Sequence, residues 1–179
     1  MAPRLPQALL VATGSDHPGI LDDISSYVTD RRGSIEAVRV INLRGRFALL
    51  VLVTADEESL RRIGADMPLL CERTGVRASL EAPDDPSSGH AASTRFRLSA
   101  AGESEADEAT TLKQVANLLR VLNINILDVS TSHTAAGGFQ IGMLLDVPRD
   151  VPVGKLRELM GQLLNRDRLR WELAADVAE

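Results

Sequence analysis

The residues that could do chemistry are concentrated in one short stretch near the N-terminus, "DHPGI", residues 16–20. Pro18 suits the first turn of a helix, where its missing N–H costs no hydrogen bond. Gly19 has no Cβ, so another molecule can approach the backbone closely. The N–H groups of Gly19, Ile20 and Leu21 would then be unpaired donors at the positive end of a helix dipole. Such a group of donors suits a carboxylate.

Asp16 adds an acceptor to the same loop. Its carboxylate could take hydrogen bonds from an ammonium group, and a carboxylate site beside an ammonium site describes a pocket for a free amino acid. A structural interpretation stands beside this one, because Asp-X-Pro-Gly is also a common composition for turns and helix caps. In that case Asp16 only caps its own helix.

The elements that would position this loop follow from the periodicity of apolar residues. Residues 8–13 form an apolar strand, and a helix follows until Gly33 stops it. Two strands, residues 35–43 and 47–55, form a hairpin, and the unbroken apolar run "FALLVLV" predicts a strand buried in the middle of a sheet. Asp56 is a candidate cap for a second helix, which Pro68 bends or splits and Gly75 ends. Residues 76–80 form the closing strand.

The second half of the chain repeats this order. A strand over residues 95–100 precedes a helix, a hairpin of residues 126–133 and 139–147, a second helix and a last strand over residues 169–173. Pairing Ile35 with Ile126 places the two copies 91 residues apart, and the same offset matches Ile24 with Val115. The stretch 83–93 between the copies is rich in Pro, Ser, Asp and Gly and reads as a linker.

Each copy is therefore βαββαβ, which predicts an α+β protein made of two ferredoxin-like repeats. Each repeat would have an antiparallel sheet with its helices on one face. The predicted domains are residues 1–82 and 94–179, joined by the linker. Pairing the two repeats side by side would stabilise both, because a repeat of roughly 75–80 residues buries a modest core.

The first half of the chain contains, in order, a strand, the loop "DHPGIL", an amphipathic helix and the stretch "RGSIEAVRV" before a hairpin. In this arrangement the sequence resembles ACT domains. Two such repeats without a catalytic or DNA-binding domain are most similar to the glycine cleavage system transcriptional repressor group. The resemblance implies ferredoxin-like modules that pair side by side into a larger sheet. It also implies an amino acid bound at the interface between them.

The resemblance also assigns the ligand-binding residues. The loop of the first repeat would contact the ligand, and a polar residue just before the second strand of the other repeat would close the site, because an amide both donates and accepts hydrogen bonds. The predicted site therefore comprises Asp16, His17, Pro18, Gly19, Ile20, Asn125 and Ile126.

The second copy of the loop departs from this pattern. At the 91-residue offset Asp107 matches Asp16, but Ala109 and Thr110 stand in place of the proline and the glycine. The stretch "AAGESEADEATT" is also longer and acidic, so it would repel a carboxylate. We expect one competent site, and a degenerate mirrored site formed by Asp107 and Ser34.

Composition and charge exclude several other classes of protein. The net charge is −5, and the basic residues are scattered, which argues against direct nucleic-acid binding. No apolar run approaches the roughly 20 residues that a membrane span needs, and there is no signal-peptide pattern, so we expect a cytoplasmic protein. The three histidines and the single cysteine lack the spacing of metal ligands. We therefore expect no metal, no cofactor and no enzymatic activity.

The function predicted from these observations is that of a non-catalytic regulatory protein. It would bind a small amino acid, glycine or serine by analogy with the family, and act through a protein partner, either a transcriptional regulator or a metabolic enzyme. Two alternatives stay open: a regulatory subunit of an amino-acid metabolic enzyme, and a structural pairing module without a ligand. ACT modules commonly associate further, so a homodimer is expected.

Overall fold

The computed structural model describes residues 5–82, 92–104, 107–166 and 168–176. The chain divides into two compact units, Met1–Ser88 and Gly89–Glu179, and each is described by itself. Most of the predicted linker, residues 83–91, lies outside the described residues. Its last residue, Ser93, already belongs to the first strand of the second unit.

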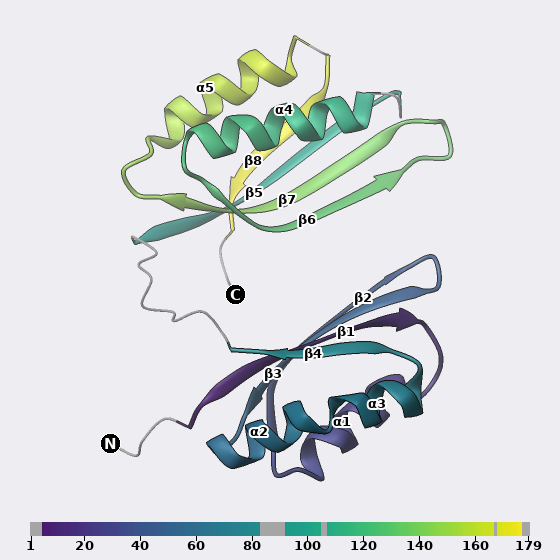
Figure 1. The fold of residues 1–179 in the computed structure, drawn as a ribbon. Coiled ribbons are helices and arrows are strands. Elements are labelled where there is room, and N and C mark those ends of the chain that lie inside the picture. The colour runs from purple at the N-terminus through teal and green to yellow at the C-terminus, as the bar shows by residue number, and fades with distance from the viewer. Residues whose placement is uncertain (1–4, 83–91, 105–106, 167, 177–179) are drawn as a thin grey trace. The chain divides into compact units, whose positions relative to one another are not determined.

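The first unit has four strands and three helices, with the helices on one face of the sheet (Figure 1). The antiparallel sheet has the strand order β2-β3-β1-β4. Its elements are β1 (Gln7–Ser15), α1 (Ile20–Thr29), β2 (Ser34–Leu43), β3 (Arg46–Thr54), α2 (Glu57–Ala65), α3 (Met67–Thr74) and β4 (Arg77–Glu81).

The second unit has the same topology, with two helices on one face of its sheet (Figure 1). The corresponding strand order is β6-β7-β5-β8. Its elements are β5 (Ser93–Gly102), α4 (Glu108–Val121), β6 (Asn125–His133), β7 (Phe139–Pro148), α5 (Val153–Leu164) and β8 (Arg170–Ala175). The predicted fold, two ferredoxin-like βαββαβ repeats, is thereby confirmed.

A β-bulge at the same place in both units marks the repeat in three dimensions. The pairing of β2 with β3 shifts register between Ile35 and Ala37, and the pairing of β6 with β7 shifts between Ile126 and Asp128. A bulge inserts one unpaired residue and bends the strand. The two shifts are 91 residues apart, as the sequence repeat is.

Alternate side chains are buried along the inner strands β1, β3, β5 and β7, and the buried apolar residues form two separate cores, one in each unit. In β1 the side chains of Leu10 and Ala12 are fully buried under the helices, while Leu9 and Val11 lie on the other face and are half-buried. This period of two is what a strand with one covered face requires. The two clusters of buried apolar residues have no member in common. On α1 the Ile20 side chain joins the core, whereas the neighbouring Leu21 is 44% exposed.

The predicted cap, break and end of the second helical segment are confirmed. The Asp56 carboxylate accepts a hydrogen bond of 2.7 Å from the Ser59 N–H and caps α2. That bond, followed by one from the Ser59 hydroxyl, lowers the pKa of the Asp56 carboxyl. Pro68 splits the segment into α2 and α3, since proline fits the first turn of a helix. Gly75, with φ of 70°, ends α3 in the left-handed conformation.

One expectation for the first sheet is wrong. "FALLVLV" predicts a strand buried along its whole length in the middle of a sheet, and β3 is indeed an inner strand, between β2 and β1. However, only alternate side chains such as Leu49 and Val51 are buried, and Leu50 between them is 38% exposed. The reason is that all the helices of this unit lie on one face, so the other face of the antiparallel sheet has no helical cover.

Candidate functional site

The loop of residues 16–20 is held by the hairpin of β2 and β3 rather than by the helix that it leads into. The Asp16 N–H donates to the Gly45 carbonyl oxygen at 2.9 Å, and the Asp16 carboxylate accepts from the Asn42 side-chain amide. The alternative in which Asp16 caps its own helix is wrong, because the cap position of α1 is Gly19 and no side chain caps it. The Asp16 carboxylate is thereby held at the mouth of the loop.

Gly19 adopts a left-handed backbone conformation with φ of 94°. A Cβ built at this position would meet no atom within 4 Å, so the space beside Gly19 is open. The glycine is required by its dihedral angle and not by crowding from the protein. The helix begins at Ile20, so Pro18, which was predicted for its first turn, lies before the helix. The first-turn N–H groups without an intrahelical partner are therefore those of Ile20, Leu21 and Asp22.

His17 ties this loop to the end of α3, although its side chain is exposed. Its Nδ1 lies 3.2 Å from the Pro18 carbonyl oxygen, and its Nε2 lies 3.4 Å from the Thr74 carbonyl oxygen. Both contacts raise the pKa of the imidazole, the Pro18 carbonyl more than the Thr74 carbonyl. A protonated ring can donate to both carbonyls at once.

We expect His17 to titrate above the ordinary histidine value of 6.5 in the folded protein. Because the pKa is raised by folding, these contacts stabilise the fold fully below the unfolded-state pKa, and their contribution is lost as the pH rises through the folded-state pKa. An NMR titration of the imidazole measures this, with the urea-unfolded protein as the control. A folded-state pKa at or below that of the unfolded chain would contradict the prediction.

The electrostatics of the loop favour an ammonium group over a carboxylate. Asp22 and Asp23 lie in the first turn of α1, and Asp23 pairs with Arg73 at 3.2 Å. Acidic side chains at a helix N-terminus offset the positive end of the dipole. Together with Asp16 they make the loop a better partner for a cation than the backbone donors alone predict.

The second copy of the loop differs in a way that the alignment did not show. Strand β5 ends at Gly102 and α4 begins at Glu108, so five residues separate them, against four between Ser15 and Ile20 in the first unit. The second loop is therefore longer, as predicted, but by one residue only. The extra residues belong to the helix, because Ala109 and Thr110 lie in an additional first turn of α4. Asp107 precedes this turn without capping it through its side chain.

In both units a side chain near the end of the second strand contacts an acidic side chain at, or just before, the start of the first helix. In the first unit the Asn42 amide donates to Asp16, and in the second unit His133 Nε2 lies 2.5 Å from Glu108 Oε2. Asn42 and His133 are 91 residues apart. The sequence interpretation missed both partners, although the repeat offset was a signal that could have paired them.

Asn125 and Ile126 are the first residues of β6 and line a hollow of about 580 Å³. We call it the α4–β6 hollow. It lies entirely within the second unit, and charged side chains from α4, β7 and the residues after β7 reach it. Its lining residues are Ser93, Ala116, Arg120, Asn123, Ile124, Asn125, Ile126, Asp146, Pro148 and Asp150.

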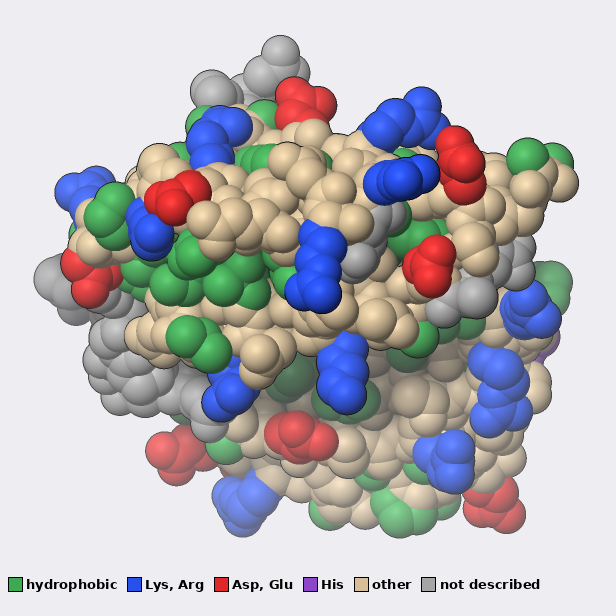
Figure 2. Space-filling view, turned by 90° about the horizontal axis from the view of Figure 1, so that it is seen from above, with side chains coloured by type: hydrophobic (Ala, Val, Ile, Leu, Met, Phe, Trp, Pro, Cys, Tyr) green, Lys and Arg blue, Asp and Glu red, His purple; other side chains and the backbone are tan. Residues whose placement is uncertain are grey.

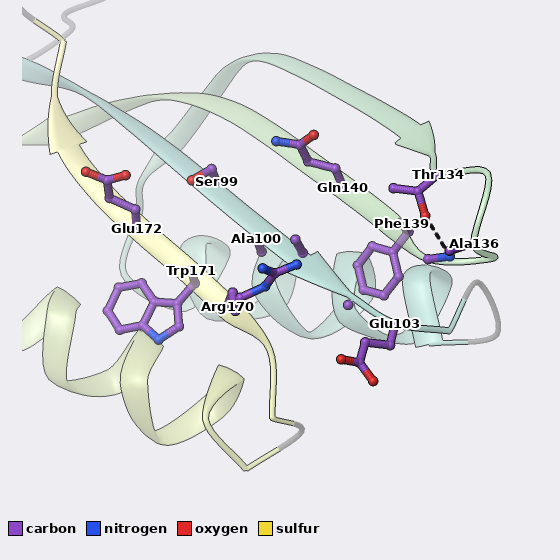
Figure 3. A pocket seen from close by; sticks show the side chains of 13 residues that line it. Ser99, Ala100, Glu103, Thr134, Ala136, Phe139, Gln140, Arg170, Trp171 and Glu172 are labelled. Carbon is purple, nitrogen blue, oxygen red and sulfur yellow. Dashed lines mark hydrogen bonds between the residues drawn. The ribbon is translucent and has the colours of Figure 1, made fainter.

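Two further hollows of the second unit contain none of the predicted residues. One of about 800 Å³ lies on the face of the sheet away from the helices, where Ser99, Gln140 and Glu172 project from neighbouring strands (Figure 3). The other is a shallow groove of about 390 Å³ between α4 and α5, with Leu118 and Leu159 among its lining residues. Figure 2 looks onto the side of these helices and shows hydrophobic side chains among many charged ones.

The structure thus places the predicted residues in two groups. Residues 16–19 form one continuous loop of the first unit and Ile20, which is buried, begins α1 directly after it, while Asn125 and Ile126 lie together in the second unit. Within the described ranges, no group of three or more His, Cys, Asp or Glu side chains could hold a metal ion. None of the helices in the described part of the chain is long and apolar enough to cross a membrane.

Comparison with known proteins finds a family model that matches part of the chain and solved structures of similar fold. A protein-family model for the ACT domain matches residues 7–81. The chain is similar to the crystal structure of a provisionally assigned glycine cleavage system transcriptional repressor, with a TM-score of 0.73, 17% identity, and coverage of 97% of this chain and 98% of that one. It is also similar to an unknown protein from Galdieria sulphuraria, with a TM-score of 0.80, 20% identity, and coverage of 96% and 99%. No curated protein matches the sequence.

Proposed function

We propose that this protein is a non-catalytic regulator that binds a free amino acid. The basis is that residues 7–81 match the family model for the ACT domain and that the second unit repeats the same fold. The ligand is a small amino acid of the glycine or serine type. Its site comprises the loop of residues 16–20 and, from the second unit, Asn125 and Ile126.

The observation that carries this proposal is the contrast between the two copies of the loop. In the first copy, Gly19 is left-handed and the space beside it is open. In the second copy, a further helical turn containing Ala109 and Thr110 occupies the equivalent stretch. The first loop therefore combines an open left-handed glycine just before its helix with a carboxylate, that of Asp16, held in place by Asn42. This contrast favours a single competent site over two.

The regulatory effect would pass through a protein partner, either a transcriptional regulator or a metabolic enzyme. Ligand binding would shift the way the two repeats, or two copies of the chain in a homodimer, pack side by side, and the partner would bind one arrangement better than the other. The net charge of −5 does not favour direct contact with nucleic acid. A cytoplasmic location fits this role.

The experiment that tests the proposal is calorimetry of the full chain with a panel of amino acids, followed by the same titration on two variants. Gly19→Asn keeps a residue that tolerates the left-handed conformation but fills the open space beside the loop. We expect it to weaken binding by at least tenfold, and Asn125→Ala to weaken binding by a similar factor through the loss of its amide.

Matched controls are available in the same chain. Gly137→Asn makes the same change at another left-handed glycine with open space around it, and Ser34→Ala truncates the residue that corresponds to Asn125. Neither control should change the affinity. If no amino acid binds or raises the melting temperature, the structural pairing module is the better description. Co-purification with an enzyme rather than a transcriptional regulator would favour the regulatory subunit.

A further inference from the structure

The α4–β6 hollow brings one cationic and two anionic side chains to the same cavity. Arg120 comes from the last turn of α4, Asp146 from β7, and Asp150 from the residues that follow β7. In the part of the chain that the structure describes, none of the three takes part in a salt bridge. Opposite charges that line one hollow without pairing leave their hydrogen-bonding capacity to a third group.

Asp146 is half-buried and fixed in position. The Ser93 hydroxyl donates to one of its carboxylate oxygens, Oδ1, at 2.6 Å. Asp146 lies directly opposite Asn125 in the pairing of β7 with β6, and opposite Arg95 in the pairing with β5, with no salt bridge to that arginine. A carboxylate offers about four acceptor sites, so most of its capacity remains after the bond to Ser93.

Arg120 is exposed at the end of α4 and makes one side-chain hydrogen bond. It donates one hydrogen bond of 3.0 Å to the Asn117 side chain, one turn earlier on α4. A guanidinium has five N–H donors in a planar fork that matches a carboxylate. The chain turns sharply after this helix, since Asn123 is left-handed with φ of 54°. The amide side chains of Asn123 and Asn125 therefore lie on either side of the turn that borders the hollow.

The first unit has no counterpart of Arg120 or of Asp146. At the 91-residue offset Thr29 stands for Arg120, and in the strand register Thr54 stands opposite Ser34 where Asp146 stands opposite Asn125. The Thr54 hydroxyl donates to Glu36 at 2.9 Å. The charged set is therefore a property of the second repeat and not of the shared fold.

From this arrangement we infer that the α4–β6 hollow supplies the charged contacts to the zwitterionic part of the amino acid, with Arg120 binding the α-carboxylate and Asp146 binding the α-ammonium, while the loop of residues 16–20 contributes the remainder of the site. The inference rests on the proposed function and deepens it, because it makes the second unit the source of both charged contacts. Asp150 and the negative end of the α4 dipole add to the attraction for the ammonium group.

The charge balance of the hollow also sets a specificity. One guanidinium against two carboxylates and a helix C-terminus leaves an excess of negative charge. A second carboxylate on the ligand would be repelled, so amino acids with neutral side chains are favoured over aspartate and glutamate. The volume of about 580 Å³ is within the range of pockets that hold small molecules.

The test uses the full chain and three probes of closely similar shape: serine, serinamide, which lacks the carboxylate, and glycerate, which lacks the ammonium group. Arg120→Met should weaken serine binding at least tenfold and leave serinamide binding unchanged. Asp146→Asn should weaken serine binding by a similar factor and leave glycerate binding unchanged. A general loss of structure would weaken all three probes together, so this pattern separates recognition from folding.

Arg157→Met and Asp128→Asn are the matched controls, since both residues belong to the second unit and neither lines the hollow. Thermal unfolding confirms that each variant is folded. Serine binding that is unchanged in Arg120→Met and Asp146→Asn but lost in Gly19→Asn overturns this inference and leaves the proposed function intact. A wild-type chain that binds no amino acid overturns both.

Discussion

Replacing Leu156 by Ala is expected to lower the free energy of unfolding of the second unit by about 2–5 kcal/mol. Leu156 lies on α5 and is fully buried among Met160, Leu164 and the strand residues of its core. The substitution removes apolar contacts and leaves a cavity in an interior that relaxes only in part. A loss of this size is a large fraction of the stability of a small domain.

The same substitution should leave the first unit nearly unaffected, because the two buried clusters share no residue. Differential scanning calorimetry or urea unfolding, followed with a probe in each unit, measures both transitions. Leu127→Ala is the control, since Leu127 is 42% exposed on β6 and its truncation should cost little. Equal shifts in both transitions would show that the units unfold as one cooperative body.

The second large effect concerns Gly102, at the end of β5. A Cβ at this position would lie 2.4 Å from Cε1 of Phe139 and 2.8 Å from Cδ2 of Leu169. Phe139 is 1% exposed and has no room to retreat. Gly102→Ala should therefore destabilise the second unit by about 1–3 kcal/mol through overpacking.

The repeat provides an internal comparison for this prediction. Gly14 holds the corresponding place opposite Phe47 in the first sheet, but its Cβ would lie 3.0 Å from that ring. Gly14→Ala should therefore cost less than Gly102→Ala. Gly154→Ala, in the first turn of α5 with no atom within 4 Å, should be neutral or stabilising. Chemical denaturation of the three variants ranks them, and a Gly14→Ala variant that is less stable than Gly102→Ala would contradict the steric argument.

The candidate site could be predicted only as far as its local part. Residues 16–20 were predicted as a loop with an exposed glycine, because proline fixes φ and glycine permits the left-handed conformation wherever they occur. The hydrogen bond from Asn42 to Asp16 and the hydrogen bond from Ser93 to Asp146 were not predicted. Each joins residues far apart in the chain, and the strand register that brings such residues together leaves no mark in the composition of either segment.

What the sequence by itself determined is the order of elements and their repetition. Apolar periodicity, the Asp56 cap, the break at Pro68 and the stop at Gly75 are local effects of backbone sterics and hydrogen bonding, and each lies where it was predicted. The tertiary structure alone decided which face of β3 is covered and that α4 gains a turn. It also decided that Arg120 and Asp146 share a hollow with Asn125. These features depend on packing between distant segments, where burial and register are properties of the folded chain as a whole.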